Sequence, residues 1–350
     1  MPQESPKFQI EPIIPSDEAD VRAFLTKAIA RPGAELAMPD GWLAWMAAGA
    51  VTIGLPEIGV GWKLVVAGEV GGVHLMVPFR AVAADGTEGV SVQSSGFYVA
   101  PQWHGPASGA LFLTLMKHRP RFHCSVSTAN KAASDVWKAF RGEFNQGSDQ
   151  EYCRMAPRPS LLEEAVARRV PLVARLLQHS NPSVRVSLSR RLASLRSRLG
   201  GALAAFGPAA VDAAVGLQWH GAGVIPSEAL LRWKLSSPVP WHDLLILQSG
   251  GRSFAAFVTG AARGHRGQVA TLTVCAVWGP AWDENPRSAI SVILDAARRD
   301  FPFITLGFSP VPDSVQSLFR RRMLDAPRRW LVRSPGQSPL LPGWNDLNSL

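Results

Sequence analysis

One stretch of the sequence joins small residues to the pattern of a turn that enters a helix. After an apolar run that ends at Val99, the chain reads Pro101-Gln-Trp-His-Gly-Pro-Ala-Ser-Gly109 and continues into a helical pattern. The first N–H groups of a helix have no partner within it, and the helix dipole places partial positive charge beside them. Because most residues from Gly105 to Gly109 are small, a phosphate can approach these N–H groups closely. The stretch therefore predicts a binding turn for a diphosphate.

The run before this turn contains a break. Residues 89–99 have the composition of a long strand, but Ser94, Ser95 and Gly96 interrupt it. A bulge or a loss of pairing there would leave a slot beside the strand, with free backbone groups for the amide-bearing arm of a ligand. The sequence thus predicts a slot directly ahead of the diphosphate turn.

Two motifs in this region resemble the acyl-CoA-binding elements of the GNAT superfamily of N-acetyltransferases. The turn is similar to the V-x-P-x-x-R-G-x-G-x-G/A motif, with His104 at the arginine and Ala107 at a glycine. Asn130-Lys-Ala-Ala-Ser-Asp-Val-Trp137 is similar to the N-x-x-A-x-x-hydrophobic-Y element, with tryptophan at the tyrosine. The resemblance implies that acetyl-CoA or another acyl-CoA binds as a substrate at Val99, His104, Gly105, Pro106, Ala107, Ser108, Gly109 and Asn130.

The resemblance also implies acyl transfer to an amine, which needs a polarised thioester carbonyl and a proton for the leaving thiolate. A backbone N–H between Phe97 and Val99 is expected to polarise the carbonyl. The chain has two tyrosines, Tyr98 and Tyr152, and neither stands at the position of the superfamily's usual acid. We predict Tyr98, just before the turn, and Ser127, on the next strand, as catalytic residues.

Three further polar residues are secondary candidates. His74 and Glu88 have the chemistry of a general base, but each is better explained as a residue of a hairpin or of the surface. His104 could contact phosphate, although a neutral imidazole is a weaker phosphate ligand than arginine.

Strands and helices predicted over residues 1–157 position these residues. Their number suits one domain. Alternating or continuous apolar runs predict strands at residues 8–13, 62–67, 73–79, 89–99 and 122–127. Helical spacing predicts helices over residues 17–29, 40–46, 101–116 and 134–140. Ser16 or Asp17 is expected to cap the first helix, and Asp40 the second. The order predicts an α/β (α+β) fold with a mixed central sheet flanked by helices.

The same order recurs over residues 206–335. We expect a helix at 227–235, a hairpin of 243–248 with 254–260, a strand at 268–278, a helix at 286–299, a strand at 303–308 and a helix at 313–323. After the long strand, Asp283 and Glu284 stand where a diphosphate would lie, and carboxylates repel phosphate. The second half is therefore expected to be a degenerate GNAT-like domain, followed by a tail at 336–350.

The net charge of +9 is concentrated in one segment. Between Arg158 and Ala205 there are nine arginines and two glutamates, with leucines at helical spacing among them. This pattern predicts two or three basic amphipathic helices whose leucines pack and whose arginines face solvent. We expect residues 158–205 to connect the two domains rather than to bind nucleic acid.

Length and composition exclude several classes of protein. A chain of 350 residues with 47% hydrophobic and 18% charged residues suits two globular domains and is not expected to be disordered. The polar amino-terminal segment is unlike a signal peptide, and no apolar run reaches the length of a membrane span. Cys124, Cys153 and Cys275 are too scattered for a disulfide framework or a zinc knuckle. We therefore expect a cytoplasmic protein without a metal.

Three functions remain open on these grounds. The first is an acyl-CoA-dependent N-acyltransferase whose amine acceptor, an amino sugar or an amino acid, enters between the halves. Its tandem arrangement resembles acyltransferases of surface polysaccharide or amino-acid acylation. The second is a binding or scaffold protein with decayed acyl sites, favoured by His104, Ala107 and the missing tyrosine. The third resembles the FemABX peptidyltransferases, with aminoacyl-tRNA held by the basic connector. The spacing of the motifs favours the first.

Overall fold

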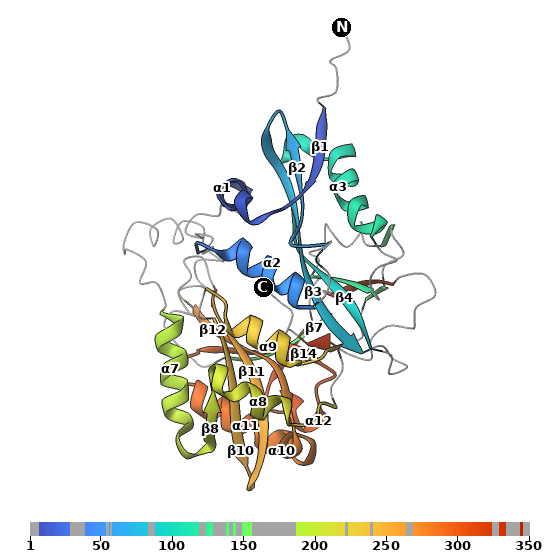
Figure 1. Cartoon of the computed structure of the whole chain (residues 1–350). Coiled ribbons are helices and arrows are strands. Elements are labelled where there is room, and N and C mark those ends of the chain that lie inside the picture. The colour runs from blue at the N-terminus through green and yellow to red at the C-terminus, as the bar shows by residue number, and fades with distance from the viewer. Residues whose placement is uncertain are drawn as a thin grey trace, which may run out of the picture.

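The computed structural model contains two large β-sheets, each with helices on both faces (Figure 1). The structure describes residues 7–28, 39–53, 56, 58–82, 88–118, 124–128, 138–139, 143–144, 149–155, 187–220, 223–238, 241–263, 269–323, 329–333 and 344–345. None of the helices in these ranges is long and apolar enough to cross a membrane.

The first sheet has the strand order β1-β2-β3-β4-β5-β16-β6, and β9 pairs with the far end of β3. Its strands are β1 (Phe8–Pro12), β2 (Gly61–Val66), β3 (Glu69–Val82), β4 (Glu88–Val99), β5 (Cys124–Thr128), β6 (Glu143–Phe144), β9 (Gly223–Val224) and β16 (Arg329–Arg333). Within the described strands, β4 and β5 run parallel and the other neighbours antiparallel. The five strands expected in the first half are confirmed as β1 to β5.

The second sheet has the order β15-β7-β13-β12-β11-β10-β8, and β14 and β17 form a separate pair. Its strands are β7 (Gln150–Met155), β8 (Leu203–Phe206), β10 (His242–Ser249), β11 (Arg252–Arg263), β12 (Val269–Trp278), β13 (Phe303–Leu306) and β15 (Arg320–Met323). The small pair is β14 (Phe308–Ser309) with β17 (Trp344–Asn345). Here too the long strand has one parallel neighbour, since β12 runs parallel to β13. Two mixed sheets flanked by helices confirm the predicted fold class.

The two sheets exchange strands. β7 follows β6 in the chain but pairs with β13 and β15 of the second sheet, whereas β16 returns to the first sheet between β5 and β6. Neither strand was expected, because their charged, short sequences give no clear apolar alternation. Since no single cut in the chain separates the two sheets, the division at residues 157, 205 and 335 stays a prediction.

Helices separate the sheets and cover their outer faces. The helices are α1 (Glu18–Ala28), α2 (Trp42–Ile53), α3 (Pro106–Lys117), α7 (Leu188–Leu199), α8 (Val211–Val215), α9 (Glu228–Leu235), α10 (Pro280–Glu284), α11 (Pro286–Ala297) and α12 (Asp313–Gln316). α1 and α2 share one apolar core with α8, α9 and the facing sides of both sheets. α3 covers the outer face of the first sheet, and α7 and α11 cover that of the second.

Two tryptophans join the halves where α2 meets α9, between the two sheets (Figure 1). The rings of Trp45 and Trp233 are stacked with centroids 4.7 Å apart. Trp45 Nε1 donates to the Trp233 carbonyl at 2.8 Å, and Trp233 Nε1 donates to the Trp45 carbonyl at 2.7 Å. Gly49 is required beside them, because a Cβ there would lie 2.4 Å from the Trp233 ring. This reciprocal contact holds the halves as one packed body.

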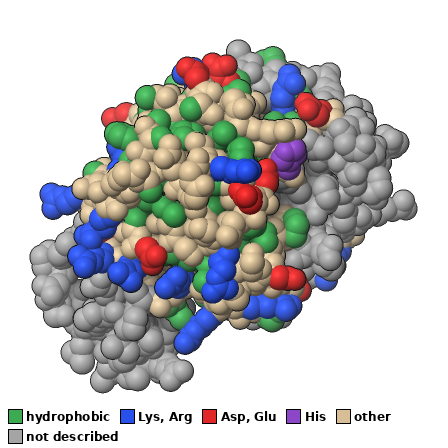
Figure 2. Space-filling view, turned by 90° about the horizontal axis from the view of Figure 1, so that it is seen from below, with side chains coloured by type: hydrophobic (Ala, Val, Ile, Leu, Met, Phe, Trp, Pro, Cys, Tyr) green, Lys and Arg blue, Asp and Glu red, His purple; other side chains and the backbone are tan. Residues whose placement is uncertain are grey.

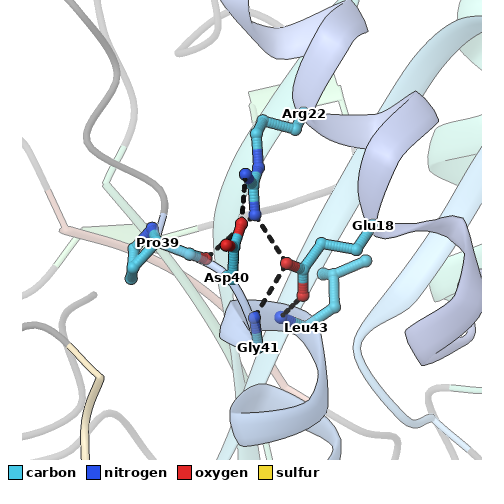
Figure 3. Close-up of polar contacts among 6 residues, drawn as sticks. All are labelled: Glu18, Arg22, Pro39, Asp40, Gly41 and Leu43. Atoms are coloured by element: carbon cyan, nitrogen blue, oxygen red, sulfur yellow. Dashed lines mark hydrogen bonds and ion pairs between the residues drawn. The ribbon is translucent and has the colours of Figure 1, made fainter.

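A carboxylate from α1 caps α2 (Figure 3). Glu18 accepts hydrogen bonds from the Gly41 N–H at 2.9 Å and from the Leu43 N–H at 3.0 Å. Asp40 was expected to be this cap. Its side chain instead accepts from Arg22 at 2.7 Å, and the same guanidinium also reaches Glu18 at 2.6 Å. A long side chain from the preceding helix thus replaces the local cap, which a sequence pattern does not reveal.

One expected helix is wrong over most of its length. Residues 313–323 were predicted to be helical, but α12 ends at Gln316 and Arg320–Met323 form β15 on the edge of the second sheet. The pairing of β15 with β7 overrides the helical spacing, and within that pair Arg322 lies 3.8 Å from Glu151. The expected strand at 303–308 is similarly divided into β13 and β14. The other helices of the second half are confirmed as α9 and α11.

The described part of the basic connector is a packed helix, as predicted. α7 buries Leu192, Leu195 and Leu199 against the second sheet. Its arginines were expected to face solvent, as exposed Arg190 does, but Arg196 instead contacts Asp243 at 2.7 Å and Arg198 contacts Asp300 at 3.0 Å in the second half. On the face in Figure 2, basic side chains are spread around the rim with acidic ones among them. The expected helices over residues 161–177 lie outside the described residues, as does most of the one at 134–140.

Candidate acyl-CoA site

A bulge interrupts β4 where the sequence has its Ser-Ser-Gly break. Leu75 of β3 pairs with Gly96, but the next residue, Met76, pairs with Ser94, so Ser95 is an extra residue in β4. A bulge bends its strand and disturbs the local ladder of hydrogen bonds. The predicted break is therefore confirmed.

The pairing of β4 with β5 ends beside this bulge. The parallel register runs from Val92 opposite Ser125 to Ser94 opposite Ser127, and within the described residues it goes no further. β4 continues to Val99, and among the described strands its partner there is β3. Within the described strands, the backbone groups of Phe97–Val99 that point away from β3 therefore have no strand partner, which is the arrangement that the predicted slot would need.

The predicted turn follows the slot and enters a helix. A short 3-10 helix (Pro101–Trp103) leads to Gly105, whose φ of 97° is a conformation that favours glycine, and α3 begins at Pro106. The Gly105 N–H donates to Ser108 Oγ at 3.1 Å, and the Ser108 hydroxyl donates to the Gly105 carbonyl at 2.9 Å. These two bonds fix the entry of α3 with the positive end of its dipole at an exposed turn.

The side chains of the turn differ in how far they are open to a ligand. His104, Gly105, Pro106 and Gly109 are exposed, and a Cβ added at either glycine would meet nothing within 4 Å. Ala107 is 7% exposed and packs in the core under α3, which explains a methyl group at the superfamily's glycine position. The open face of the turn can therefore take an anion without a rearrangement of the core.

His104 holds the end of β4. Its Nε2 lies 3.0 Å from the Val99 carbonyl oxygen, and because a carbonyl only accepts, Nε2 carries the proton. A neutral ring in this tautomer has no second N–H for a phosphate, so His104 would donate to one only as an imidazolium. In the structure, His104 holds the turn against the end of β4 through this hydrogen bond. An arginine at this position would instead offer a permanent positive charge to a phosphate.

The structure brings only some of the predicted residues together. Val99 and the turn lie at the α3 side, whereas half-buried Tyr98 packs against the core shared by the two halves. Ser127 is the register partner of Ser94 on β5. Glu88 is exposed at the far end of β4. Asn130 lies outside the described residues.

Sequence reasoning missed a polar pair beside the bulge. His74 is fully buried, and its Nε2 lies 2.7 Å from Ser94 Oγ. Burial lowers the pKa of the His74 imidazole to about 3, so the ring is neutral near pH 7. The signal in the sequence was alternation along β3, which places His74 on the same face as buried Met76.

The second half repeats the bulge at the matching place. Phe257 of β11 pairs with Ala276 and Val258 pairs with Val274, so Cys275 is the extra residue of β12. The parallel pairing of β12 with β13 ends one residue earlier, at Val274 opposite Leu306. Both halves therefore carry a bulge directly after the last parallel pair.

Beyond the bulge, the end of β12 in the second half is covered by neighbouring segments of the same half. Trp278 Nε1 donates to the Ala214 carbonyl at 3.0 Å. A Cβ at Gly279 would lie 3.2 Å from Leu217, a closeness that the exposed glycines of the first turn do not have. Asn285 caps α11 by accepting from the Ser288 N–H at 3.0 Å.

Acidic side chains also occupy this end of the second half. Asp283 lies 4.0 Å from His220, and Glu284 lies 3.1 Å from Arg252. Both carboxylates belong to α10, the segment that stands where the first half has its open turn. In the described residues, no group of three or more His, Cys, Asp and Glu side chains is placed to hold a metal ion.

Comparison with known proteins gives matches at the level of structure. No protein-family model and no curated protein sequence matches the chain. A GCN5-related N-acetyltransferase from Kribbella flavida matches with a TM-score of 0.53 and 12% identity, over 93% of this chain and 71% of that one. Eis1 from Mycobacterium abscessus matches with a TM-score of 0.50 and 14% identity, over 94% and 74%. A probable N-acyltransferase from Enterococcus faecalis V583 matches with a TM-score of 0.50 and 10% identity, over 94% and 73%.

Proposed function

Since the chain has the fold of GCN5-related N-acetyltransferases, we propose that it is a cytoplasmic acyl-CoA-dependent N-acyltransferase. One observation carries the proposal: a bulge at Ser95, the end of β4–β5 pairing and an exposed turn into α3 follow one another along a single strand. Each part suits one part of an acyl-CoA. The dipole of α3 suits the diphosphate, and the opening beside Phe97–Val99 suits the pantetheine amides.

The reaction forms an amide and releases a thiol. The amine nitrogen attacks the thioester carbonyl, the C–S bond breaks, the amine loses a proton and the CoA thiolate gains one. Backbone N–H groups after the bulge would stabilise the negative charge that develops on the carbonyl oxygen. Tyr98 and Ser127 remain the proposed sources of the proton, with Ser127 the nearer to the opening by register.

The acceptor site is proposed to lie between the halves. Tyr98 packs against the shared core, so the β4 face opposite α3 is turned toward the second half. An amino sugar or an amino acid, as in surface-polysaccharide or amino-acid acylation, is the proposed acceptor. The covered end of β12 supports one acyl-CoA per chain, bound to the first half.

A second candidate is a protein that binds acyl-CoA without transferring the acyl group. It is favoured by His104, whose donor nitrogen is engaged by Val99 where the superfamily's motif has an arginine. A tRNA-dependent transferase receives less support, since Arg196 and Arg198 of the connector bind carboxylates of the second half.

Calorimetry with CoA and a thiol-release assay separate these candidates. The proposed enzyme binds one CoA per chain and releases free thiol from acetyl-CoA when amino sugars or amino acids are supplied. Binding without thiol release for any amine favours the second candidate. Absence of CoA binding overturns both.

A further inference from the structure

A buried hydrogen bond joins His74 of β3 to Ser94 of β4, at 2.7 Å between Nε2 and Oγ. His74 is 0% exposed and Ser94 is 4% exposed. Taking an imidazole and a hydroxyl out of water costs free energy that one hydrogen bond only partly offsets. Such a pair therefore calls for a reason beyond filling space.

The pair lies at the junction of three parts of the proposed acyl site. Within the described part of β5, Ser94 is the last residue of β4 that pairs with this strand, and it directly precedes the bulged Ser95. The His74 ring also packs edge-on against Phe97, after the bulge, with centroids 5.0 Å apart. On its other side it stacks on Phe112 of α3, with centroids 5.8 Å apart. One side chain thus contacts β4 on both sides of the bulge and the helix that begins at the diphosphate turn.

The second half shows that the bulge itself does not need this pair. By register, His74 corresponds to Ala256 and Ser94 to Val274, both 0% exposed. An apolar pair thus supports the same bulge at Cys275. The polar pair occurs in the half whose turn is exposed and is replaced in the half whose corresponding end is covered by Trp278 and Leu217.

We propose that His74 is a positioning residue of the acyl site, acting through Ser94 and Phe97 to fix the backbone N–H groups that follow the bulge. The inference rests on the proposed function, because those N–H groups are the proposed partners of the thioester carbonyl. Polar groups that stabilise a developing charge must be held to within a fraction of an ångström. A hydrogen bond before the bulge and a ring contact after it supply that restraint. The ring performs this role as a neutral imidazole.

The test compares acetyl-CoA with CoA, because only acetyl-CoA presents a carbonyl to these N–H groups. Calorimetry on the full chain measures both ligands for wild type, Ser94→Ala and Ser94→Thr. The wild type is expected to bind acetyl-CoA more tightly than CoA. Ser94→Ala is expected to weaken acetyl-CoA about fivefold to tenfold and CoA less than about twofold. Ser94→Thr keeps the hydroxyl and is expected to restore most of the difference.

Two further variants separate positioning from general stability. Ser91→Ala removes another buried hydroxyl of β4, on the opposite face, and is expected to leave both affinities unchanged. His74→Phe keeps an aromatic ring beside Phe97 and Phe112 but loses Nε2. It is expected to match Ser94→Ala, and the double variant is expected to lose no more than either single one, because both remove the same bond.

Each outcome decides the matter. Selective loss of acetyl-CoA affinity in Ser94→Ala, with recovery in Ser94→Thr, supports the inference. Equal losses for acetyl-CoA and CoA, or no loss in a folded Ser94→Ala variant, overturn it and leave the proposed function standing. A wild type that binds CoA and acetyl-CoA equally also overturns it. A wild type that binds neither ligand overturns the proposed function and this inference together.

Discussion

β4 and β12 hold equivalent places in their sheets. Each pairs antiparallel on one side and parallel on the other, and each carries one extra residue, Ser95 or Cys275, next to its last parallel pair. β4 then leads to an exposed turn, whereas β12 ends where Trp278 bonds to α8 and Leu217 crowds Gly279. The comparison shows that the two strands share the same bulge and the same end of parallel pairing. The segments that pack on the end of each strand then decide whether the turn that follows it is exposed or covered.

The strongest test asks whether the halves can be separated at all. A fragment of residues 1–157 is expected not to fold, because it lacks β16, which pairs with β5, and Trp233, which stacks on Trp45. Its β7 would also lose its place beside β13. Circular dichroism and thermal unfolding, with the full chain as reference, check this. A cooperative unfolding transition in the fragment would show that the first half is independent.

The second test adds a charge at the open turn. Gly109 is exposed with free space at its Cβ position, so Gly109→Glu is expected to lower CoA affinity at least about tenfold through repulsion of the diphosphate. Gly109→Gln has the same size without the charge and serves as the control. Glycine 105 is less suitable, because its φ of 97° would strain any other residue. Calorimetry that finds equal CoA affinity for the two variants would refute the diphosphate turn.

The matching change in the second half sharpens this result. Asp283→Asn removes a carboxylate from the covered end of β12 and is expected to leave both CoA affinity and stoichiometry unchanged. A second bound CoA in this variant would mean that charge alone had closed the second half.

The third test concerns the contact between the halves. Trp45→Phe and Trp233→Phe each remove an indole donor and leave a buried carbonyl without that partner. Each is expected to lower the free energy of unfolding by about 1–3 kcal/mol. Because the two bonds form one reciprocal unit, the double variant should lose less than the sum. Denaturant unfolding measures all three, and strict additivity would argue against a coupled pair.

The smallest effects are expected at the connector helix. Asp243 is 2% exposed and Arg196 31% exposed in their ion pair, so Arg196→Gln is expected to cost about 1–2 kcal/mol at pH 7. Exposed Arg190, outside this ion pair, provides the control, and Arg190→Gln is expected to change stability by less than about 0.5 kcal/mol.

The loss at Arg196 is expected to depend on pH. Burial raises the pKa of the Asp243 carboxyl, and Arg196 opposes that shift. In Arg196→Gln the pKa of Asp243 in the folded state rises further above its value in the unfolded state. Between these two pKa values the folded protein holds more protons than the unfolded one, so the free energy of unfolding falls as pH rises. The amount by which Arg196→Gln lowers the free energy of unfolding relative to wild type should therefore become smaller as the pH is lowered from 7. Denaturant unfolding at several pH values checks this, and a deficit that grows toward low pH would contradict it.

The sequence predicted the strands and helices that have local patterns better than the contacts between segments far apart in the chain. Apolar periodicity located β1 to β5, α9 and α11, and the Ser94–Gly96 break located the bulge, because these signals are local. β7, β15 and β16 were missed because each depends on a partner far away in the chain. The cap supplied by Glu18 was missed for the same reason.

The residues of the candidate site also divide into those that a local pattern predicts and those that it does not. The turn residues from His104 to Gly109 could be predicted, since a motif and helix-start chemistry coincide there. The His74–Ser94 pair could not, because the bulge changes the register by one residue and sequence spacing alone does not say which side chains then meet. Tyr98 was predicted as a catalytic residue from its place just before the turn, and the structure shows that it also packs against the shared core.

Strand exchange also bears on the order in which this protein can be completed during synthesis. β5 acquires its partner β16 only after roughly 200 further residues have been made, since Thr128 pairs with Arg329. Until then the growing chain carries an incomplete sheet edge beside the proposed ligand slot, the kind of edge that recruits strands from other molecules. The nascent first half is therefore expected to need protection by chaperones, and overproduction is expected to yield aggregates more readily than the stability of the finished protein would suggest.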